Sequence, residues 1–185
     1  MIRIGLDLDD TINYWWDIYL KRFGKPVDDT EVTYNVVNVL KFDRDFWESL
    51  PVKNRPEGFE PALYCTARVN NKRWTKHWLE KNGFPKKPVY QRFGYGLSKA
   101  PMIKGRVDVF IDDSPFNVFD LNQNGIPCLM LRTPQNEHVE FKYKINTLNY
   151  DEIIYQYNKI KLTLMNTNEN RSKRRRSSIT TINIG

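Results

Sequence analysis

The stretch IGLDLDDTIN, residues 4–13, places three aspartates directly behind an apolar run. Residues 2–8 have the composition of a strand that is buried on both faces, as strands are in a parallel sheet. Asp7, Asp9 and Asp10 then bring like charges together, although carboxylates repel one another and are costly to remove from water. A nearby cation would offset this repulsion, so the stretch predicts a functional site at the end of a strand.

Apolar runs alternate with segments of helical character along the rest of the chain. We expect further strands at 61–67, 87–93, 107–111 and 126–131, and helices at 14–24, 70–84, 99–104, 115–124 and 149–162. This alternation is typical of an α/β fold, in which helices cover both faces of a mostly parallel sheet. The sequence therefore predicts a five-stranded, mostly parallel sheet.

Polar clusters follow three of the predicted strands. Asp7 to Asp10 follow the first strand, Thr66 to Arg68 the second, and Asp112 with Asp113 the fourth. Ligands of such sheets bind beyond the carboxyl ends of the strands, so we expect these clusters to meet at one edge. An all-oxygen set of donors in a chain with only two histidines suits a hard cation, and Mg²⁺ is the usual one beside phosphate.

Length and composition indicate one folded domain. A chain of 185 residues, 40% of them hydrophobic, can bury a core, and we expect that domain to occupy residues 1–165. Cys65 and Cys128 lie in apolar runs, which predicts buried thiols in a reduced, cytoplasmic protein. No apolar stretch is long enough to span a membrane, and the first residues lack the pattern of a signal peptide.

The positive charge is concentrated in a tail. The chain carries a formal net charge of +7, and residues 166–185 hold five basic residues against one acidic residue. This composition predicts a disordered basic tail. The interpretations that remain open for the tail are a nucleic-acid-binding arm, a signal like those for nuclear import, a kinase target and a solubilising extension.

Four short motifs resemble those of the haloacid dehalogenase (HAD) superfamily of phosphotransferases. They are DLDDT (7–11), LYCT (63–66), a lysine before the fourth strand, and FIDDSP (110–115), and they occur in the order that the family uses. The resemblance covers residues 1 to about 132. It implies a Rossmann-like three-layer α/β/α sandwich with a small helical cap inserted at about 13–60. It also implies a Mg²⁺-dependent phosphomonoester hydrolase that works through an aspartyl-phosphate.

The resemblance implies a role for each matching residue. Asp7 is similar to the family's nucleophile and Asp9 to its general acid and base, while Thr66 matches the hydroxyl that binds the phosphoryl group. The lysine of the third motif is Lys99 or Lys104, and its place at the start of a short helix favours Lys99. The implied metal ligands are Asp7, Asp9 through its backbone carbonyl, Asp112 and Asp113. Asp10 is expected to point away and to support the turn.

The implied cap is rich in aromatic residues. Its size and the segment FWESLP (46–51) resemble 5'(3')-deoxyribonucleotidase-like proteins, including phage-encoded ones, in which cap aromatics stack on the base. On this basis Phe46, Trp47 and Trp16 are candidates for contact with a substrate, and the alternative is that they hold the cap to the body. Residues 67–84 also resemble the 3'-phosphatase half of polynucleotide kinases, in which case Arg68 would contact phosphate. The alternative for Arg68 is exposure to solvent at the start of a helix.

Three hypotheses follow. The first is a phosphatase of nucleoside monophosphates, with deoxyribonucleotides preferred. The second is a phosphatase of nucleic-acid 3'-ends, with the basic tail holding the polymer, and the third is a non-catalytic phosphate- or nucleic-acid-binding module. An idle scaffold would have no chemical need for Asp7, Asp9 and Asp112 together, which argues against the third. A monomer and a homodimer are both compatible with the sequence.

Overall fold

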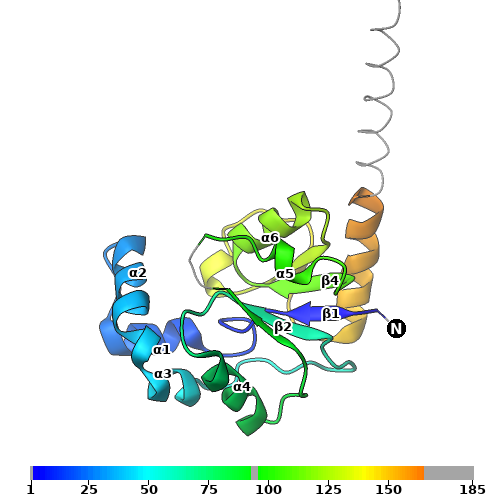
Figure 1. Ribbon diagram of the computed structural model, residues 1–185. Helices are drawn as coiled ribbons and strands as arrows, with labels where there is room; N and C mark the ends of the chain where they lie inside the picture. The colour runs from blue at the N-terminus through cyan, green and yellow to red at the C-terminus, as the bar shows by residue number, and fades with distance from the viewer. Residues whose placement is uncertain (1, 93–95, 165–185) are drawn as a thin grey trace, which may run out of the picture.

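The computed structural model describes residues 2–92 and 96–164. The predicted tail at 166–185 lies outside the described residues. Within them the chain forms one sheet of six parallel strands in the order β3-β2-β1-β4-β5-β6, and Figure 1 labels the neighbouring strands β1, β2 and β4. The strands are β1 (Ile4–Leu6), β2 (Leu63–Thr66), β3 (Val89–Gln91), β4 (Val109–Asp112), β5 (Cys128–Leu131) and β6 (Lys144–Ile145). The predicted α/β class is therefore confirmed.

The predicted number of strands was too low by one. β6 has only two residues, and it pairs with the end of β5 through Met130 and Leu131. Two residues are too few to show a strand pattern in the sequence, and Lys144 is polar. The strand exists because β5 offers it a partner, which is a tertiary cause.

Helices cover the sheet on both faces and make three layers. The helices are α1 (Trp15–Phe23), α2 (Asp29–Asn38), α3 (Arg44–Ser49), α4 (Lys72–Lys81), α5 (Ala100–Ile103), α6 (Pro115–Gln123) and a last one at 150–164, with 3₁₀ turns η1 (Leu40–Phe42) and η2 (Pro134–Asn136). In Figure 1, α4 lies on one side of the sheet, and α5 and α6 lie on the other. The five helices predicted from 14 to 162 are all present. The ends of the first four are shifted by at most three residues, and the last begins at residue 150 and is helical to the last described residue, 164.

Alternating side chains of the strands build two separate cores. Leu6 and Ile111 face one core, which includes Trp78 of α4 and Ile153 of the last helix. Cys65, Phe110 and Met130 face the other, which includes residues of α5 and α6 such as Ile103 and Leu121. This is the period-two alternation of a strand that is buried on both faces. Cys65 and Cys128 are buried free thiols, as predicted.

The close packing of β1 on β4 requires a glycine. A Cβ atom at Gly5 would lie 2.7 Å from the ring of Phe110 and 2.8 Å from a methyl group of Val107. Any side chain there would push these residues away from the second core. Gly5 therefore lets the strand that ends at Asp7 lie in the middle of the sheet.

Helices α1, α2 and α3 lie together in the segment between β1 and β2, to one side of the sheet in Figure 1. Trp47 of α3 and Tyr19 of α1 are buried in this segment, which is hereafter called the cap (13–60). The indole N–H of Trp78 in α4 donates a hydrogen bond to the carbonyl of Leu50, so α4 also carries the base of the cap. No helix among the described residues is both long enough and apolar enough to cross a bilayer.

Candidate active site

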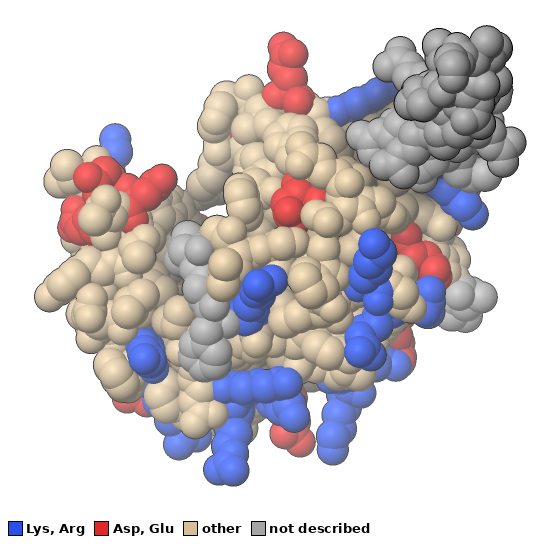
Figure 2. Space-filling view, turned by 45° about the horizontal axis from the view of Figure 1, so that its top comes forward, with Lys and Arg blue, Asp and Glu red and all other residues tan. Residues whose placement is uncertain are grey.

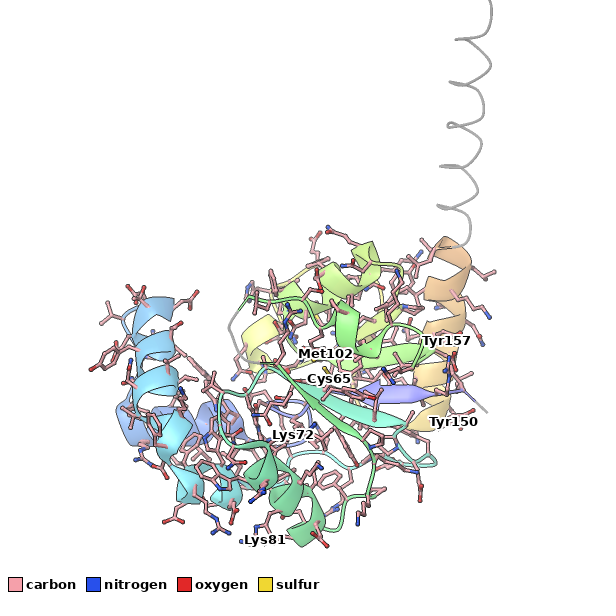
Figure 3. All side chains as sticks on the ribbon, viewed as in Figure 1. Cys65, Lys72, Lys81, Met102, Tyr150 and Tyr157 are labelled. Atoms are coloured by element: carbon pink, nitrogen blue, oxygen red, sulfur yellow. The ribbon has the colours of Figure 1, made fainter. Side chains whose placement is uncertain are left out.

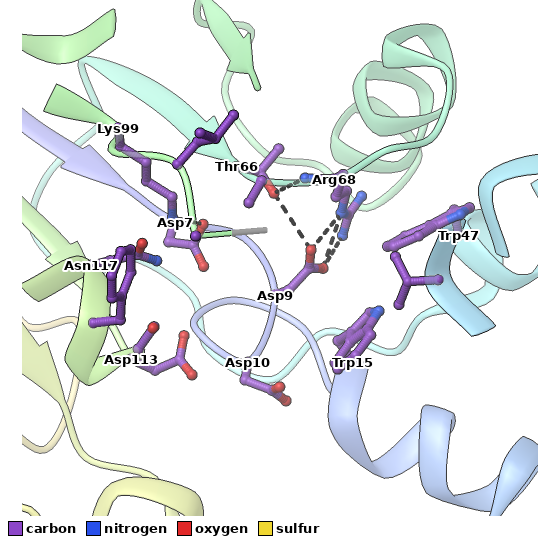
Figure 4. A pocket seen from close by; sticks show the side chains of 16 residues that line it. Asp7, Asp9, Asp10, Trp15, Trp47, Thr66, Arg68, Lys99, Asp113 and Asn117 are labelled. Carbon is purple, nitrogen blue, oxygen red and sulfur yellow. Dashed lines mark hydrogen bonds and ion pairs between the residues drawn. The ribbon is translucent and has the colours of Figure 1, made fainter. Parts of the chain in front are cut away.

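A cavity of about 310 Å³ opens at the carboxyl ends of β1, β2 and β4, beneath the cap (Figure 4). Each of the three strands ends in, or runs directly into, a polar residue of this region. The lining residues are Asp7, Asp9, Asp10, Trp15, Val36, Trp47, Thr66, Ala67, Arg68, Gly96, Leu97, Lys99, Asp113, Ser114, Phe116 and Asn117. The three polar clusters predicted to share one edge therefore do so.

Lys99 lies between two carboxylates at the bottom of this site. Its ammonium group donates hydrogen bonds to Oδ1 of Asp7 at 2.6 Å and to Oδ2 of Asp112 at 2.7 Å. Burial opposes the charge of Lys99, but the carboxylates of Asp112 and Asp7 outweigh it and raise the lysine's pKa well above the ordinary value. Lys104 is exposed at the end of α5. Of the two candidate lysines, the structure therefore brings Lys99 to the site.

Asp7 is held in an environment that disfavours its charge. Burial raises its pKa to about 7, Lys99 opposes this rise, and the negative charges of Asp112 and Asp9 add to it. Only 5% of the residue is exposed, and its backbone N–H donates to the carbonyl of Ile111 in β4. The sheet thus fixes the backbone of Asp7. The positive charge of Lys99 does not fully offset the effects of burial and of the neighbouring carboxylates on the pKa of Asp7.

The donor set fits a divalent hard cation. Asp7, Asp112 and Asp113 each offer a carboxylate oxygen, and these atoms lie within 4.8 Å of one another. Burial, followed by the charges of Asp112 and Asp7, raises the pKa of Asp113 well above its ordinary value, although the hydroxyl of Thr11 donates to it at 3.0 Å. Three crowded carboxylates without histidine or thiolate match the ligands that Mg²⁺ prefers.

Asp9 and Arg68 form a second polar group in the site, apart from Lys99 and the three clustered carboxylates. Nε of Arg68 donates to both carboxylate oxygens of Asp9 at 3.0 and 2.9 Å, and Nη2 donates to Oδ1 at 2.6 Å. Asn13 also donates to Oδ1, and the Thr66 hydroxyl lies 3.5 Å from Oδ2. The Asp9 carboxylate therefore faces Arg68 and Thr66, as Figure 4 shows, and is not one of the three clustered carboxylates.

Arg68 joins this polar group to the cap. Its guanidinium lies 4.9 Å from the ring centroid of Trp47, and its Nη1 is buried without a hydrogen-bond partner in the described residues. The residue was expected to contact phosphate or to be exposed at the start of a helix. It is 2% exposed, so the exposed alternative is wrong, and its present partner is Asp9.

Asp10 lines the cavity, contrary to the expectation that it points away. Its φ of 58° places it in the left-handed region, and its carboxylate accepts the backbone N–H of Trp16 at 3.1 Å. The expected support of the turn is therefore present. Burial is the main cause that raises the pKa of Asp10 to about 7, and the Trp16 N–H and Lys53 oppose the rise.

The cap contributes Trp15, Val36 and Trp47 to the cavity. Of the three cap aromatics predicted from the sequence, Trp47 lines it, whereas Phe46 and Trp16 do not. Phe46 is buried inside the cap with its ring edge against Trp47, and Trp16 stacks on Tyr19 at 5.4 Å. These ring contacts of both residues lie within the cap, so they pack its interior, whereas the alternative was that they hold the cap to the body.

Sequence reasoning missed several lining residues. Trp15 carries a weak signal, because it shares one helical face with the buried Tyr19. Asn117 donates to Oδ1 of Asp112 at 3.1 Å from the first turn of α6, and no motif indicated it. Leu97 and Phe116, which are both largely exposed, complete the rim.

Comparison with protein-family models gave no match, and comparison with curated proteins gave none either.

Proposed function

We propose that the protein is a Mg²⁺-dependent phosphomonoester hydrolase of the HAD type that works through an aspartyl-phosphate on Asp7. One observation carries this proposal: Lys99 bridges Asp7 and Asp112 at the carboxyl edge of the sheet, with Asp113 beside them. Phosphoryl transfer requires positive charge around the transferred group and a positioned nucleophile, and this edge supplies both.

The described side chains support a two-step reaction. In the first step an Asp7 oxygen bonds to phosphorus, the bond from phosphorus to the leaving oxygen breaks, and Asp9 gives a proton to that oxygen. In the second step Asp9 takes a proton from water, the water oxygen bonds to phosphorus, and Asp7 leaves as a free carboxylate. Lys99 and the Thr66 hydroxyl offset the charge on the phosphoryl oxygens in both steps.

Asp7, Asp112 and Asp113 would hold the Mg²⁺ ion, together with the backbone carbonyl of Asp9. When bound, the cation neutralises the clustered carboxylates and lowers the pKa of Asp7, so that the nucleophile is ionised at neutral pH. Arg68 holds the Asp9 carboxylate through its forked contact, and Asp9 is not one of the three clustered carboxylates, which leaves it available for the proposed proton transfer.

The aromatic residues of the cavity support a nucleoside monophosphate as substrate, and the preference for a deoxyribonucleotide is proposed from the resemblance of the cap. Trp15 and Trp47 present indole surfaces opposite the charged edge, and stacking of a base on an aromatic side chain contributes about 1 to 3 kcal/mol. A cavity of about 310 Å³ is at the small end of the range for small-molecule sites. Buried free thiols at Cys65 and Cys128 suit the reducing cytoplasm, where we place the protein.

The test is a screen for phosphate release. The substrates are nucleoside 5'- and 3'-monophosphates in the ribose and deoxyribose series, sugar phosphates and 3'-phosphorylated oligonucleotides, each with Mg²⁺ and with a chelator. We expect turnover of nucleotides that requires Mg²⁺ and is lost in Asp7→Asn, because an amide cannot form the acyl phosphate. Undiminished activity of Asp7→Asn would refute the mechanism, and equal rates across bases and sugars would refute the nucleotidase assignment alone.

A further inference from the structure

One stretch of the folded body is strongly basic. Residues 72–87 hold six lysines and arginines against one acidic residue, a net charge of +5, whereas the remainder of residues 1–165 holds 18 basic and 20 acidic residues, a net charge of −2. Figure 2 shows blue side chains gathered on the lower side of the molecule, on the side where Figure 1 places α4. The five exposed lysines and arginines of this stretch, called here the basic face, are Lys72, Arg73, Lys76, Lys81 and Lys86.

The charges of the basic face are not paired with acidic side chains in the described part of the chain. None of its five residues forms an ion pair with the acidic residues of the described ranges 2–92 and 96–164. Lys87, which lies next to the face, is instead paired with Glu60 at 2.8 Å. The five charges are therefore available for an external anion, at the entropic cost of ordering long side chains.

The face extends along α4 and begins near the candidate active site. α4 starts four residues after Arg68 of the cavity, and Lys72 and Lys81 mark its two ends in Figure 3. Nine residues of helix separate them, which is about 14 Å. Beside the second half of α4, a groove of about 420 Å³ is lined by Lys76, Lys86 and Lys87 together with Glu80 and the apolar residues Leu79, Phe84, Pro85 and Val89.

We propose that the basic face binds the sugar-phosphate backbone of a nucleic acid. Exposed lysines and arginines spread along and just after α4 can contact several phosphates of such a polymer, and release of counterions drives the association. A lipid surface fits less well, because none of the large apolar side chains exposed in the described residues lies within 72–87 to insert between lipids. Binding at this face needs no chemistry, so the inference stands apart from the proposed phosphatase activity.

The test measures binding of the full-length protein to a fluorescent single-stranded oligonucleotide of about 12 nucleotides, by anisotropy in a chelator. The variant Lys72→Ala/Arg73→Ala/Lys76→Ala removes three charges of the face, and Lys21→Ala/Lys25→Ala/Lys41→Ala removes three exposed charges of the cap. Both retain the tail. For the first variant, the slope of the logarithm of the binding constant against the logarithm of the salt concentration should be shallower by about 2. Its binding near 150 mM salt should be weaker by at least about tenfold. The cap variant should stay within about twofold of the wild type.

Equal affinity and slope in the basic-face variant and the wild type would overturn the inference, and so would an equal loss in the cap variant. Displacement of the probe by polyglutamate as effectively as by unlabelled oligonucleotide of the same charge would show a site for any polyanion and would also overturn it, as would equally tight binding to anionic vesicles. Exposed alanines favour a helix, and thermal melts check the fold. The pair Lys81→Ala/Lys86→Ala repeats the test at the other end of the face.

Discussion

The charged edge of the sheet and the aromatic wall of the cap face the same cavity but are built differently. At the edge, Asp7, Asp112 and Lys99 are held by charge-assisted contacts of 2.6 and 2.7 Å at the ends of buried strands. In the cap, Trp15 and Trp47 are positioned by helix packing, and the indole of Trp47 is fixed by its hydrogen bond to the Leu40 carbonyl. The edge depends on the placement of charge and the wall on shape. The difference suggests that chemistry and substrate choice can be changed separately.

The largest expected effect is the loss of the buried lysine. Lys99→Met keeps the length of the side chain but removes the charge shared by Asp7 and Asp112, and we expect kcat to fall about 10²- to 10³-fold. Steady-state phosphate release measures it, with Lys104→Met on the exposed end of α5 as the matched control. Equal losses in the two variants would show that the edge does not depend on the position of its cation.

The next effect concerns the residue that joins the two regions. Arg68→Lys retains a positive charge but loses the forked contact with Asp9 and the flat contact with Trp47. We expect kcat to fall about 10- to 100-fold, which corresponds to roughly 1.4 to 2.7 kcal/mol. The pH profile of kcat should change as well, because Asp9 is the proposed proton carrier. A change in KM alone would indicate that Arg68 only binds substrate.

A smaller effect is expected from the cap. Trp15→Leu should lower kcat/KM for nucleoside monophosphates about 5- to 100-fold through lost stacking, while hydrolysis of glycerol phosphate stays nearly unchanged. Phe46→Leu is the control, because Phe46 is buried outside the cavity. If Trp15→Leu lowers both substrates equally, the wall and the edge are not separable.

The smallest effect is on stability and tests whether the edge carries excess negative charge. Burial raises the pKa of Asp10 from 3.8 to about 7, so between about pH 4 and 7 the folded protein holds a proton that the unfolded chain has lost. Stability then falls as the pH rises through this window, and Asp7 acts in the same direction. Asp10→Asn cannot titrate and tolerates the left-handed backbone.

The corresponding measurement is a set of thermal melts in a chelator at pH values across that window. We expect the Tm of the wild type to decline more than that of Asp10→Asn, by at least about 2–4 °C, the shift that 1 kcal/mol produces in a chain of this size. Mg²⁺ should restore part of the loss at the higher pH. Identical pH dependence in the two proteins would mean that burial does not raise the pKa of Asp10 in the folded protein.

The sequence predicted the edge well because its residues lie next to strongly patterned elements. Asp7, Thr66 and Asp112 each end or follow an apolar strand, and the topology of a parallel sheet then brings them together. The position of Lys99 at the start of a short helix favours it over Lys104. In the structure Lys99 is buried at the site, whereas Lys104 is exposed.

The cap was predicted less well because its aromatics all have similar local patterns. Trp15 and Trp16 are neighbours in one helix, and only the packing of α1 decides which of them lines the cavity. The partner of Arg68 and the sixth strand also depend on contacts between distant segments. Tertiary packing decides such features. The local periodicity of a single sequence therefore does not predict them.

The most direct test of the central claim is to trap the covalent intermediate. Protein mixed with Mg²⁺ and a nucleoside monophosphate is quenched and reduced with borohydride, which converts an aspartyl-phosphate to homoserine, and the modified residue is located by peptide mass spectrometry. We predict homoserine at Asp7. None should form in the two controls, which are the protein without substrate and the Asp7→Asn variant. Modification at Asp9 or Asp113, or turnover without any modified aspartate, would contradict the account.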